Sequence, residues 1–321
     1  MDSRIGTALI AVVVVPILLV GYIQAGEWLL ERLPRRIALR MRPYLWVFPA
    51  VAFATVFMVL PTIYQFVISF QDSRGNWVGT ANYIYFFTNP DTLGSLKNNV
   101  LWLVFFTGFV VLFGLLFSVL FDRVPYEPIA KTAVFLPLPI SAVAASIIWK
   151  FMYEYQPAGH AQTGTLNAAL SVVGLGPISW MTNTTTNNWA LIAVGVWTST
   201  AFAMVILSAA LKGINAELLE AARVDGASEL RILWSIIVPL LMPTLTVITT
   251  TMVITALKVF DVVYTLTSGA YGTDVIANQL YFRITNSDYG KAAAVGVVLL
   301  LAVTPILVLN IRRFREQEEL R

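Results

Sequence analysis

The sequence lacks cysteine altogether and contains a single histidine, His160. The absence of cysteine excludes disulfides, thiolate metal ligands and a cysteine nucleophile, and one histidine leaves almost no material for a zinc site. Charged residues are also scarce, at 12%, whereas 58% of the 321 residues are hydrophobic. This balance lies far outside that of soluble globular proteins, so the sequence indicates an integral membrane protein.

Seven apolar runs are long enough to cross a hydrocarbon core of about 30 Å, which takes roughly 20 helical residues. Lipid offers backbone groups no water to bond, and a closed barrel would need alternating strands, so each run is predicted to be a helix. The fold class is therefore an all-α, polytopic membrane protein with about seven transmembrane helices. The runs cover residues 5–23, 44–70, 98–121, 132–153, 189–211, 239–263 and 292–311.

The first of these runs is open to two interpretations, a retained helix and a cleaved signal peptide. Its apolar core exceeds the usual length of such a peptide, and no clean small-x-small cleavage site follows it. We expect a retained helix.

The basic residues divide unequally between the two sets of connections, and they form no aromatic-interleaved patch of the kind that binds nucleic acid. Because cytoplasmic loops carry an excess of Lys and Arg, the richer set is expected to face the cytoplasm. The N-terminus is then outside and the C-terminus in the cytoplasm. Fourteen residues form the richer set, Arg32, Arg35, Arg36, Arg40, Arg42, Arg123, Lys131, Lys212, Arg223, Arg231, Arg312, Arg313, Arg315 and Arg321, and six the other, Arg4, Arg74, Lys97, Lys150, Arg283 and Lys291.

A polar island, EAARVDGASELRILWSIIVPLLMP, spans residues 220–243 between two apolar runs. Asn215 is a suitable N-cap for a helix that carries Glu220 in its continuation. Asp225 and Gly226 form a turn signal, because glycine adopts a left-handed backbone easily. The pattern predicts two short helices that meet at a turn, the second with an apolar side made of Leu230, Leu233, Trp234 and Ile237. Composition alone leaves two interpretations open, a docking surface for another protein and an interfacial helix without a partner.

The island resembles the EAA signature of permease subunits from binding-protein-dependent ABC importers, although Leu233 stands where that family often has Phe. PTIYQFVISF upstream and FDVVYTLTSGAYGT downstream are similar to the carbohydrate subgroup, in particular to the larger permease subunit of maltose and α-glucoside importers. The common Gly-Gly-Pro of that subgroup is replaced by Gly269, Ala270 and Tyr271. The residues in family register are Glu220, Ala221, Ala222, Asp225, Gly226, Ala227 and Pro239.

The resemblance begins near residue 44, which divides the chain into an N-terminal helix with its basic loop, residues 1–42, and a permease domain, residues 43–321. It implies that the coupling loop, residues 212–238, inserts a helix into a groove on a cytoplasmic ATPase. Nucleotide-driven closure of the ATPases would then switch the permease between outward and inward openings. The residues implied in this coupling are Glu220, Ala221, Ala222, Asp225, Gly226 and Ala227.

The resemblance also implies a transport subunit rather than an enzyme, located in the cell membrane of a prokaryote. The chain contains no GxxxxGK[ST] motif to hold phosphates, so ATP and Mg are expected on two partner ATPase subunits and no cofactor is expected on this chain. A second permease subunit and an external solute-binding protein complete the expected assembly. Its substrate would be a sugar, such as a disaccharide or short oligosaccharide.

Polar residues within the apolar runs are candidates for the solute path, because a charge at the bilayer centre costs roughly 2.5–3.5 kcal/mol and usually faces a bundle interior. Lys258 and Asp261 lie three positions apart on one predicted helix, so they can pair with each other, or Lys258 can border the solute. The preceding run offers aromatic and hydroxyl groups that suit a sugar. With the register of the maltose permease, the predicted path residues are Trp197, Thr198, Ser199, Phe202, Thr255, Ala256, Lys258 and Val259.

An ion-gradient-driven secondary transporter is the alternative function, with its coupling site at Lys258 and Asp261. No inverted repeat is visible in the sequence, which argues against this class. A membrane enzyme would need catalytic groups that converge at one face, and the sequence shows none.

Overall fold

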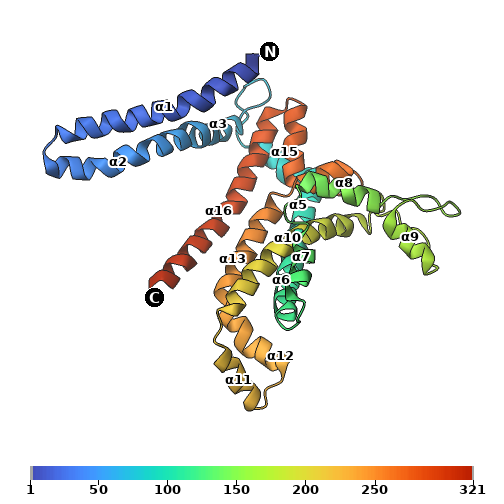
Figure 1. The fold of residues 1–321 in the computed structure, drawn as a ribbon. Coiled ribbons are helices and arrows are strands. Elements are labelled where there is room, and N and C mark those ends of the chain that lie inside the picture. Colours follow the sequence, from blue (N-terminus) through green and yellow to red (C-terminus); the bar gives the residue numbers. More distant parts are fainter. Residues whose placement is uncertain (1–2, 320–321) are drawn as a thin grey trace. The chain divides into compact units, whose positions relative to one another are not determined.

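The computed structural model describes the backbone of residues 3–319 and the side chains of residues 12–308. Within that part the regular structure is helical, apart from one isolated β-bridge between Gln71 and Trp77. The all-α prediction is therefore confirmed. The chain separates into two compact units, Met1–Val67 and Ile68–Arg321 (Figure 1). Five arginines that belong to the predicted charge bias lie outside the residues whose side chains are described. They are Arg4, Arg312, Arg313, Arg315 and Arg321.

Six helical segments among the described residues are long and apolar enough to cross a membrane. Each overlaps one of the seven predicted runs, so the multi-pass membrane architecture is confirmed. Their bounds are Val12–Glu31, Arg35–Ile68, Pro90–Phe121, Asn187–Lys212, Glu229–Leu257 and Tyr289–Val308.

The predicted run 132–153 is not one helix, and this prediction was wrong. The structure divides it into α7 (Glu127–Phe135) and α8 (Ala142–Met152), which a turn separates. Pro137 and Pro139 lie in the turn, and a proline inside a helix lacks the N–H and clashes with the preceding turn. The chain then restarts at Ser141, whose side chain accepts a hydrogen bond from the N–H of Ala144. Neither helix has the roughly 20 residues that a span requires.

The predicted run 239–263 also has different limits. The helix begins with α12 (Glu229–Ile232), continues through the π-helical segment η3 (Leu233–Ile237), and ends with α13 (Val238–Leu257). A separate short helix, α14 (Asp261–Thr267), follows. Lys258 and Asp261 therefore do not share a helix, and no ion pair joins them in the part of the chain that the structure describes.

The first unit consists of α1 (Ser3–Glu31), α2 (Arg35–Ala54), the π-helical segment η1 (Thr55–Val59) and most of α3 (Leu60–Ile68). Pro34 precedes α2 in an extended conformation, which suits the reversal between the first two helices. Glu27 on α1 connects them, because its carboxylate accepts hydrogen bonds from Arg42, at 2.7 Å, and from the indole of Trp46, at 3.0 Å.

The core of the second unit forms where α6 (Thr107–Phe121) packs along α10 (Asn187–Lys212). Gly114 permits this contact, because a Cβ placed on it would lie 2.5 Å from the Cβ of Ala203. α5 (Pro90–Leu101) and η2 (Trp102–Phe106) precede α6 and contribute the buried side chains of Trp102 and Phe106. α13 packs against both α6 and α10, and α16 (Tyr289–Glu319) packs against α13.

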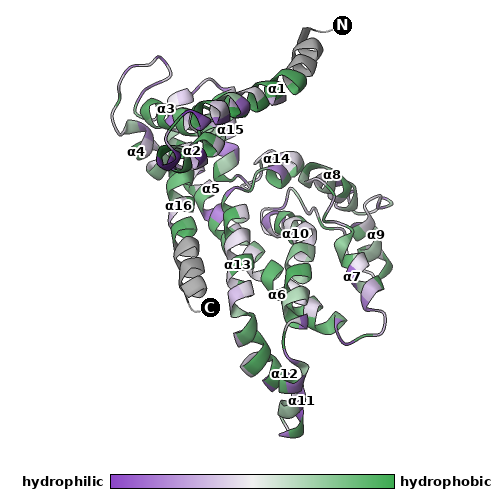
Figure 2. Cartoon of the chain, turned by 60° about the vertical axis from the view of Figure 1, so that its left-hand side comes forward, coloured by the Kyte–Doolittle hydropathy of each residue, from purple (hydrophilic) through white to green (hydrophobic). Residues whose placement is uncertain are grey.

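Shorter helices occupy the two ends of the second unit. α8, α14 and α15 (Ile276–Thr285) lie at one end, and α11 (Ala216–Val224) and α12 lie at the other (Figures 1 and 2). Two further short helices are α4 (Ala81–Thr88) and α9 (Thr165–Val172). The chain thus presents two separate surfaces, one at each end of its core.

Candidate functional site

The helical hairpin formed by α11 and α12 is the first candidate site. It confirms the predicted turn between two helices and the short first helix, whereas the second helix is the start of a long one that continues to Leu257. The side chain of Asn215 accepts a hydrogen bond from the N–H of Glu217 at 3.0 Å, as expected of an N-cap. Ser228 caps the second helix in the same way by accepting from the N–H of Arg231. Both helix starts are therefore specified by local sequence.

The turn between the two helices is a Schellman motif. Gly226 has a left-handed backbone, with φ of +80°. Its N–H donates to the carbonyl oxygen of Arg223, and the N–H of Ala227 donates to that of Ala222, both at 3.0 Å. The two alanines are half-buried and pack against the core, so their small size lets the turn lie close to the membrane helices.

The outer surface of the hairpin contains acidic, small and apolar side chains, together with the basic side chains of Arg223 and Arg231. Glu220, Ala221, Asp225 and Gly226 are exposed, and Val224 is 87% exposed.

The predicted apolar side of the second helix is corrected by the structure. Ile232 and Ile237 are its buried residues, whereas Leu230 and Trp234 are 71% and 63% exposed. The π-helical segment η3 begins at Leu233 and changes the helical phase there, so a regular period misassigns the face.

Glu229 connects the hairpin to its surroundings. Its carboxylate pairs with Arg223 of α11 at 2.8 Å and with Arg123, in the connection after α6, at 2.6 Å. The hydrogen bond that the Arg223 guanidinium donates to Glu229 raises the pKa of Arg223 above its ordinary value. These side chains are 40–47% exposed, so each pair contributes little stability alone, but the shared carboxylate orients α11 relative to α12.

A second ion cluster lies at the base of the hairpin, around Glu127 of α7. Its carboxylate contacts Lys131 at 2.6 Å and Lys212, the last residue of α10, at 2.7 Å. The hydrogen bonds from Lys131 and then Lys212 lower the pKa of Glu127 to about 2. Lys131 also donates to the hydroxyl of Ser208. The cluster ties α7 to the point where α10 leads into the hairpin.

The second candidate site is a cavity of about 290 Å³ between α10 and the end of α13. The structure brings five of the eight predicted path residues together in its wall, and it adds aromatic side chains that sequence reasoning missed. Ala256 is fully buried and Phe202 packs against the core instead. The predicted residues in the wall are Thr198, Ser199, Thr255, Lys258 and Val259, and the added ones include Trp102, Phe106 and Phe260.

The polar groups of this cavity have a defined hydrogen-bonding character. Thr198 donates its hydroxyl proton to the carbonyl oxygen of Gly195, and Thr255 donates to that of Thr251, each at 2.9 Å. Both hydroxyls keep lone pairs that can accept from a solute. Lys258 offers a donor and Asp261 an acceptor. The indole N–H of Trp102, in the same wall, is buried without a partner among the described residues.

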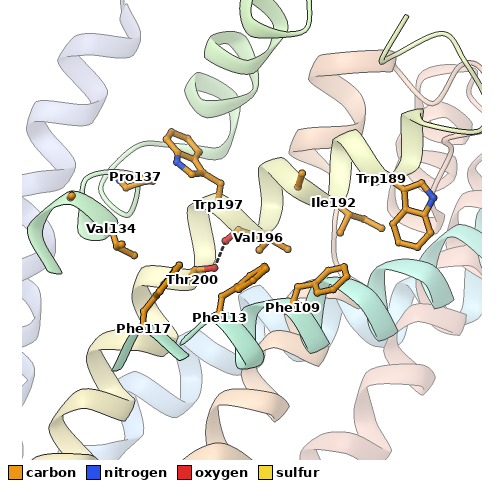
Figure 3. A pocket seen from close by; sticks show the side chains of 12 residues that line it. Phe109, Phe113, Phe117, Val134, Pro137, Trp189, Ile192, Val196, Trp197 and Thr200 are labelled. Atoms are coloured by element: carbon orange, nitrogen blue, oxygen red, sulfur yellow. Dashed lines mark hydrogen bonds between the residues drawn. The ribbon is translucent and has the colours of Figure 1, made fainter. Parts of the chain in front are cut away.

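Trp197 belongs to a different cavity, of about 610 Å³, between α6, α7 and α10. Figure 3 shows a row of phenylalanines on α6, Phe109, Phe113 and Phe117, opposite the side chains of α10. Thr200 is the one hydroxyl-bearing residue that lines it, and its proton goes to the carbonyl oxygen of Val196 at 2.7 Å. The aromatic and hydroxyl cluster predicted on α10 is thus divided between two faces of the helix.

Buried asparagines are the feature that sequence reasoning missed. Asn98 and Asn99 precede η2, and Asn187 and Asn188 begin α10; three of the four are buried and Asn188 is half-buried. Their side chains bond to backbone groups or to one another. One asparagine pair begins an apolar run and the other directly precedes one. Both were visible signals, because polar side chains at membrane depth need partners.

Comparison with known proteins identifies the class. Residues 130–315, from α7 to α16, match the family described as binding-protein-dependent transport system inner membrane component. "Osmoprotective compounds uptake permease protein GgtC" of Synechocystis sp. is 47% identical over 86% of this chain and 100% of its own length. "Alpha-glucoside transport system permease protein AglF" of Rhizobium meliloti is 41% identical over 86% and 83%, and "Trehalose/maltose transport system permease protein MalF" of Thermococcus litoralis is 30% identical over 85% and 94%.

A solved structure shares the fold. The matching chain of a bacterial ABC transporter involved in the import of the acidic polysaccharide alginate superimposes with a TM-score of 0.72 at 24% identity, over 87% of this chain and 99% of that one. The family match and the relatives together show that the protein is a multi-pass membrane permease, a transport subunit rather than an enzyme. It belongs to the family of binding-protein-dependent transport system inner membrane components.

Proposed function

We propose that this permease imports a carbohydrate, specifically a disaccharide or short oligosaccharide such as an α-glucoside, by alternating access that partner ATPases drive. The observation that carries the coupling is the α11–α12 hairpin, which exposes Glu220, Asp225 and Gly226 on a turn held by its own backbone. A small, rigid surface of this kind suits insertion into a groove of a second protein.

The partners follow from the same proposal. Two ATPase subunits would bind ATP and Mg and receive the hairpin residues Glu220, Ala221, Ala222, Asp225, Gly226 and Ala227. A second permease subunit and an external solute-binding protein would complete the assembly. The hairpin would then lie on the cytoplasmic side, as the charge bias predicts, and the permease domain would comprise residues 43–321.

The hydroxyl-lined cavity supports a sugar as the solute. Thr198, Ser199 and Thr255 can accept hydrogen bonds there, Lys258 can donate them, and Phe260 offers an aromatic surface. Sugars present alternating hydroxyl groups and apolar ring faces, which this combination matches. Relatives named for α-glucosides and for trehalose and maltose support the same substrate class.

Transport in proteoliposomes tests the energy source. The complete complex, with binding protein outside and ATP inside, is expected to accumulate radiolabelled maltose or another α-glucoside only when ATP is present, and ionophores should not reduce the uptake. Uptake without ATP that collapses when the ion gradient is dissipated would instead identify a secondary transporter.

The cavity itself is tested by Lys258→Met. We expect a higher apparent KM for sugar uptake and unchanged association with the ATPase subunits, because the change removes a donor from the cavity and leaves the hairpin intact. Lys97→Met is the matched control, since Lys97 does not line this cavity. Equal uptake kinetics in both variants and the parent would refute the assignment of the cavity.

A further inference from the structure

Asn99, near the end of α5, forms hydrogen bonds with the ends of two helices that lie far from it in the sequence. Its side-chain Nδ2 donates to the carbonyl oxygens of Ala256, at 3.3 Å, and Leu257, at 3.4 Å, the last two residues of α13. Its Oδ1 accepts from the N–H of Ile276, the first residue of α15, at 2.8 Å. Asn99 is only 2% exposed. One carboxamide therefore serves backbone groups that helix ends leave without intrahelical partners.

The neighbouring Asn98 holds the connection between the same helices. Its Nδ2 donates to the carbonyl oxygens of Gly272 and Asp274, each at 2.8 Å, in the loop between α14 and α15. Its Oδ1 accepts from Asn188, in the first turn of α10, at 3.3 Å. The asparagine pair thus connects α10, which carries Thr198 and Ser199, to the end of α13 and the segments that follow it.

The break after Leu257 shapes the wall of the solute cavity. Lys258, Val259 and Phe260, which lie between α13 and α14, all line it. An interrupted helix inside a membrane protein exposes carbonyl groups at a depth where water is scarce, so another part of the protein must supply a donor. The backbone N–H of Val259 donates to the carbonyl oxygen of Ala256 at 3.3 Å. Asn99 supplies a second donor to that oxygen, and a donor to the carbonyl oxygen of Leu257, from α5. If α13 instead continued into α14, Lys258 would be an ordinary helical residue and this wall would not exist.

We propose that Asn99 is a positioning residue of the transport path: it stabilises the interruption between α13 and α14, and so fixes Lys258 in the cavity. Asn99 does not line the cavity itself. It acts through the end of α13. The functional importance of this geometry rests on the proposed role of the cavity in sugar transport.

Because this chain contains no cysteine, a thiol introduced into it is the only one on this subunit, and its labelling can be measured on this subunit. Lys258→Cys is introduced in the full complex, and the rate at which the new thiol reacts with a small, membrane-impermeant methanethiosulfonate is measured with and without Asn99→Leu. Loss of the donor should change the rate by at least about twofold, the lower limit of the coupling between residues that share a hydrogen-bond network. Asn99→Ser, which is smaller and polar, is the second variant if the leucine variant does not fold.

Asn82→Leu is the matched control. Asn82 is also a buried asparagine, 7% exposed, and its Nδ2 donates to the carbonyl oxygens of Ser69 and Gln71 at 2.9 and 2.8 Å. It does not line the cavity, so its loss should leave the reaction rate of the thiol at position 258 unchanged. An unchanged rate in the Asn99 variants, an equal change in the control, or a thiol at position 258 that never reacts would each overturn the proposal.

A transport measurement separates this proposal from that of the cavity. Asn99→Leu should weaken sugar uptake in the parent and have little further effect in Lys258→Met, whereas Asn82→Leu should be additive with Lys258→Met. If Lys258→Met alone changes nothing while Asn99→Leu still alters the labelling of the Lys258→Cys variant, the role of the cavity fails and the positioning by Asn99 stands. Additive effects of Asn99→Leu and Lys258→Met on uptake would contradict the positioning role.

Discussion

The backbone N–H of Ala227 lies 3.0 Å from the carbonyl oxygen of Ala222, and this hydrogen bond closes the turn of the α11–α12 hairpin around Gly226. The bond requires the left-handed backbone of Gly226, with φ of +80°. Most other L-residues adopt that conformation only at a cost of about 1–2 kcal/mol. The conformation of one glycine therefore controls the surface that we assign to the ATPases.

Gly226→Val should loosen the hairpin and reduce copurification of the ATPase subunits. A Cβ at this position would meet no atom within 4 Å, so the effect comes from backbone conformation and not from a clash. Gly226→Asn is the control, because asparagine tolerates the left-handed region. Hydrogen exchange of residues 216–237 should increase in the valine variant and much less in the asparagine variant. ATPase association of Gly226→Val at the level of the parent would contradict the docking assignment.

The cluster around Glu127 predicts a loss of stability in acid. The pKa of this carboxyl is lowered to about 2 by its hydrogen bonds from Lys131 and Lys212. A carboxyl with a lowered pKa stabilises the fold above its unfolded value, near 4.5, and that contribution is lost as pH falls from about 4.5 toward 2. The midpoint of thermal unfolding in detergent, measured from pH 6 to pH 3, should fall less steeply for Glu127→Gln. Parallel curves for the two proteins would show that the cluster does not contribute.

The contact between α6 and α10 predicts sensitivity to volume at Gly114. Gly114→Ala should lower the unfolding temperature, because the added Cβ would lie 2.5 Å from the Cβ of Ala203 and overpacking typically costs about 1–3 kcal/mol. Ala203→Gly in the same chain removes the opposing methyl group and should restore much of the loss. Failure of the second change to compensate would mean that the two helices do not meet at this pair.

Asn167 should hold the long connection between α8 and α10. Its Nδ2 donates to the carbonyl oxygens of Glu154 and Ile178, and its Oδ1 accepts from the N–H of Ile178 and the indole of Trp180, all between 2.9 and 3.1 Å. Asn167→Ala leaves buried polar groups without partners, at about 1–3 kcal/mol for each. Limited proteolysis within residues 155–188 should accelerate. Asn183→Ala, an exposed position in the same connection, should not change the rate, and equal rates in both variants would refute the role of Asn167.

The structure of the hairpin is predicted in large part by its local sequence. Asn215, Asp225 and Gly226 specify its start and turn through bonds to backbone groups within a few positions, and the structure confirms both. The helix after Ser228 was placed correctly, but its buried face was not. The phase change at η3 depends on packing that no local pattern records.

The cavity is a site whose residues the local sequence predicts only in part. Polarity at membrane depth predicted Lys258, and the aromatic and hydroxyl cluster with the family resemblance predicted Thr198, Ser199 and Thr255. The structure brings all four together. The same reasoning put Lys258 and Asp261 on one helix and Trp197 beside Thr198, and it overlooked Asn99. The partners of Asn99 are 157 and 177 positions away in the chain, so only the fold places them beside it.

By itself, the sequence determined that the protein crosses a membrane many times, that its structure is helical, and that a capped hairpin interrupts the apolar runs. These properties follow from composition, periodicity and backbone preferences, which act over a few residues. Only the tertiary structure decided where α13 ends, which face of α10 borders each cavity, and which asparagine satisfies the interrupted helix. Those outcomes depend on packing and on the need of buried backbone groups for partners, which distant segments supply.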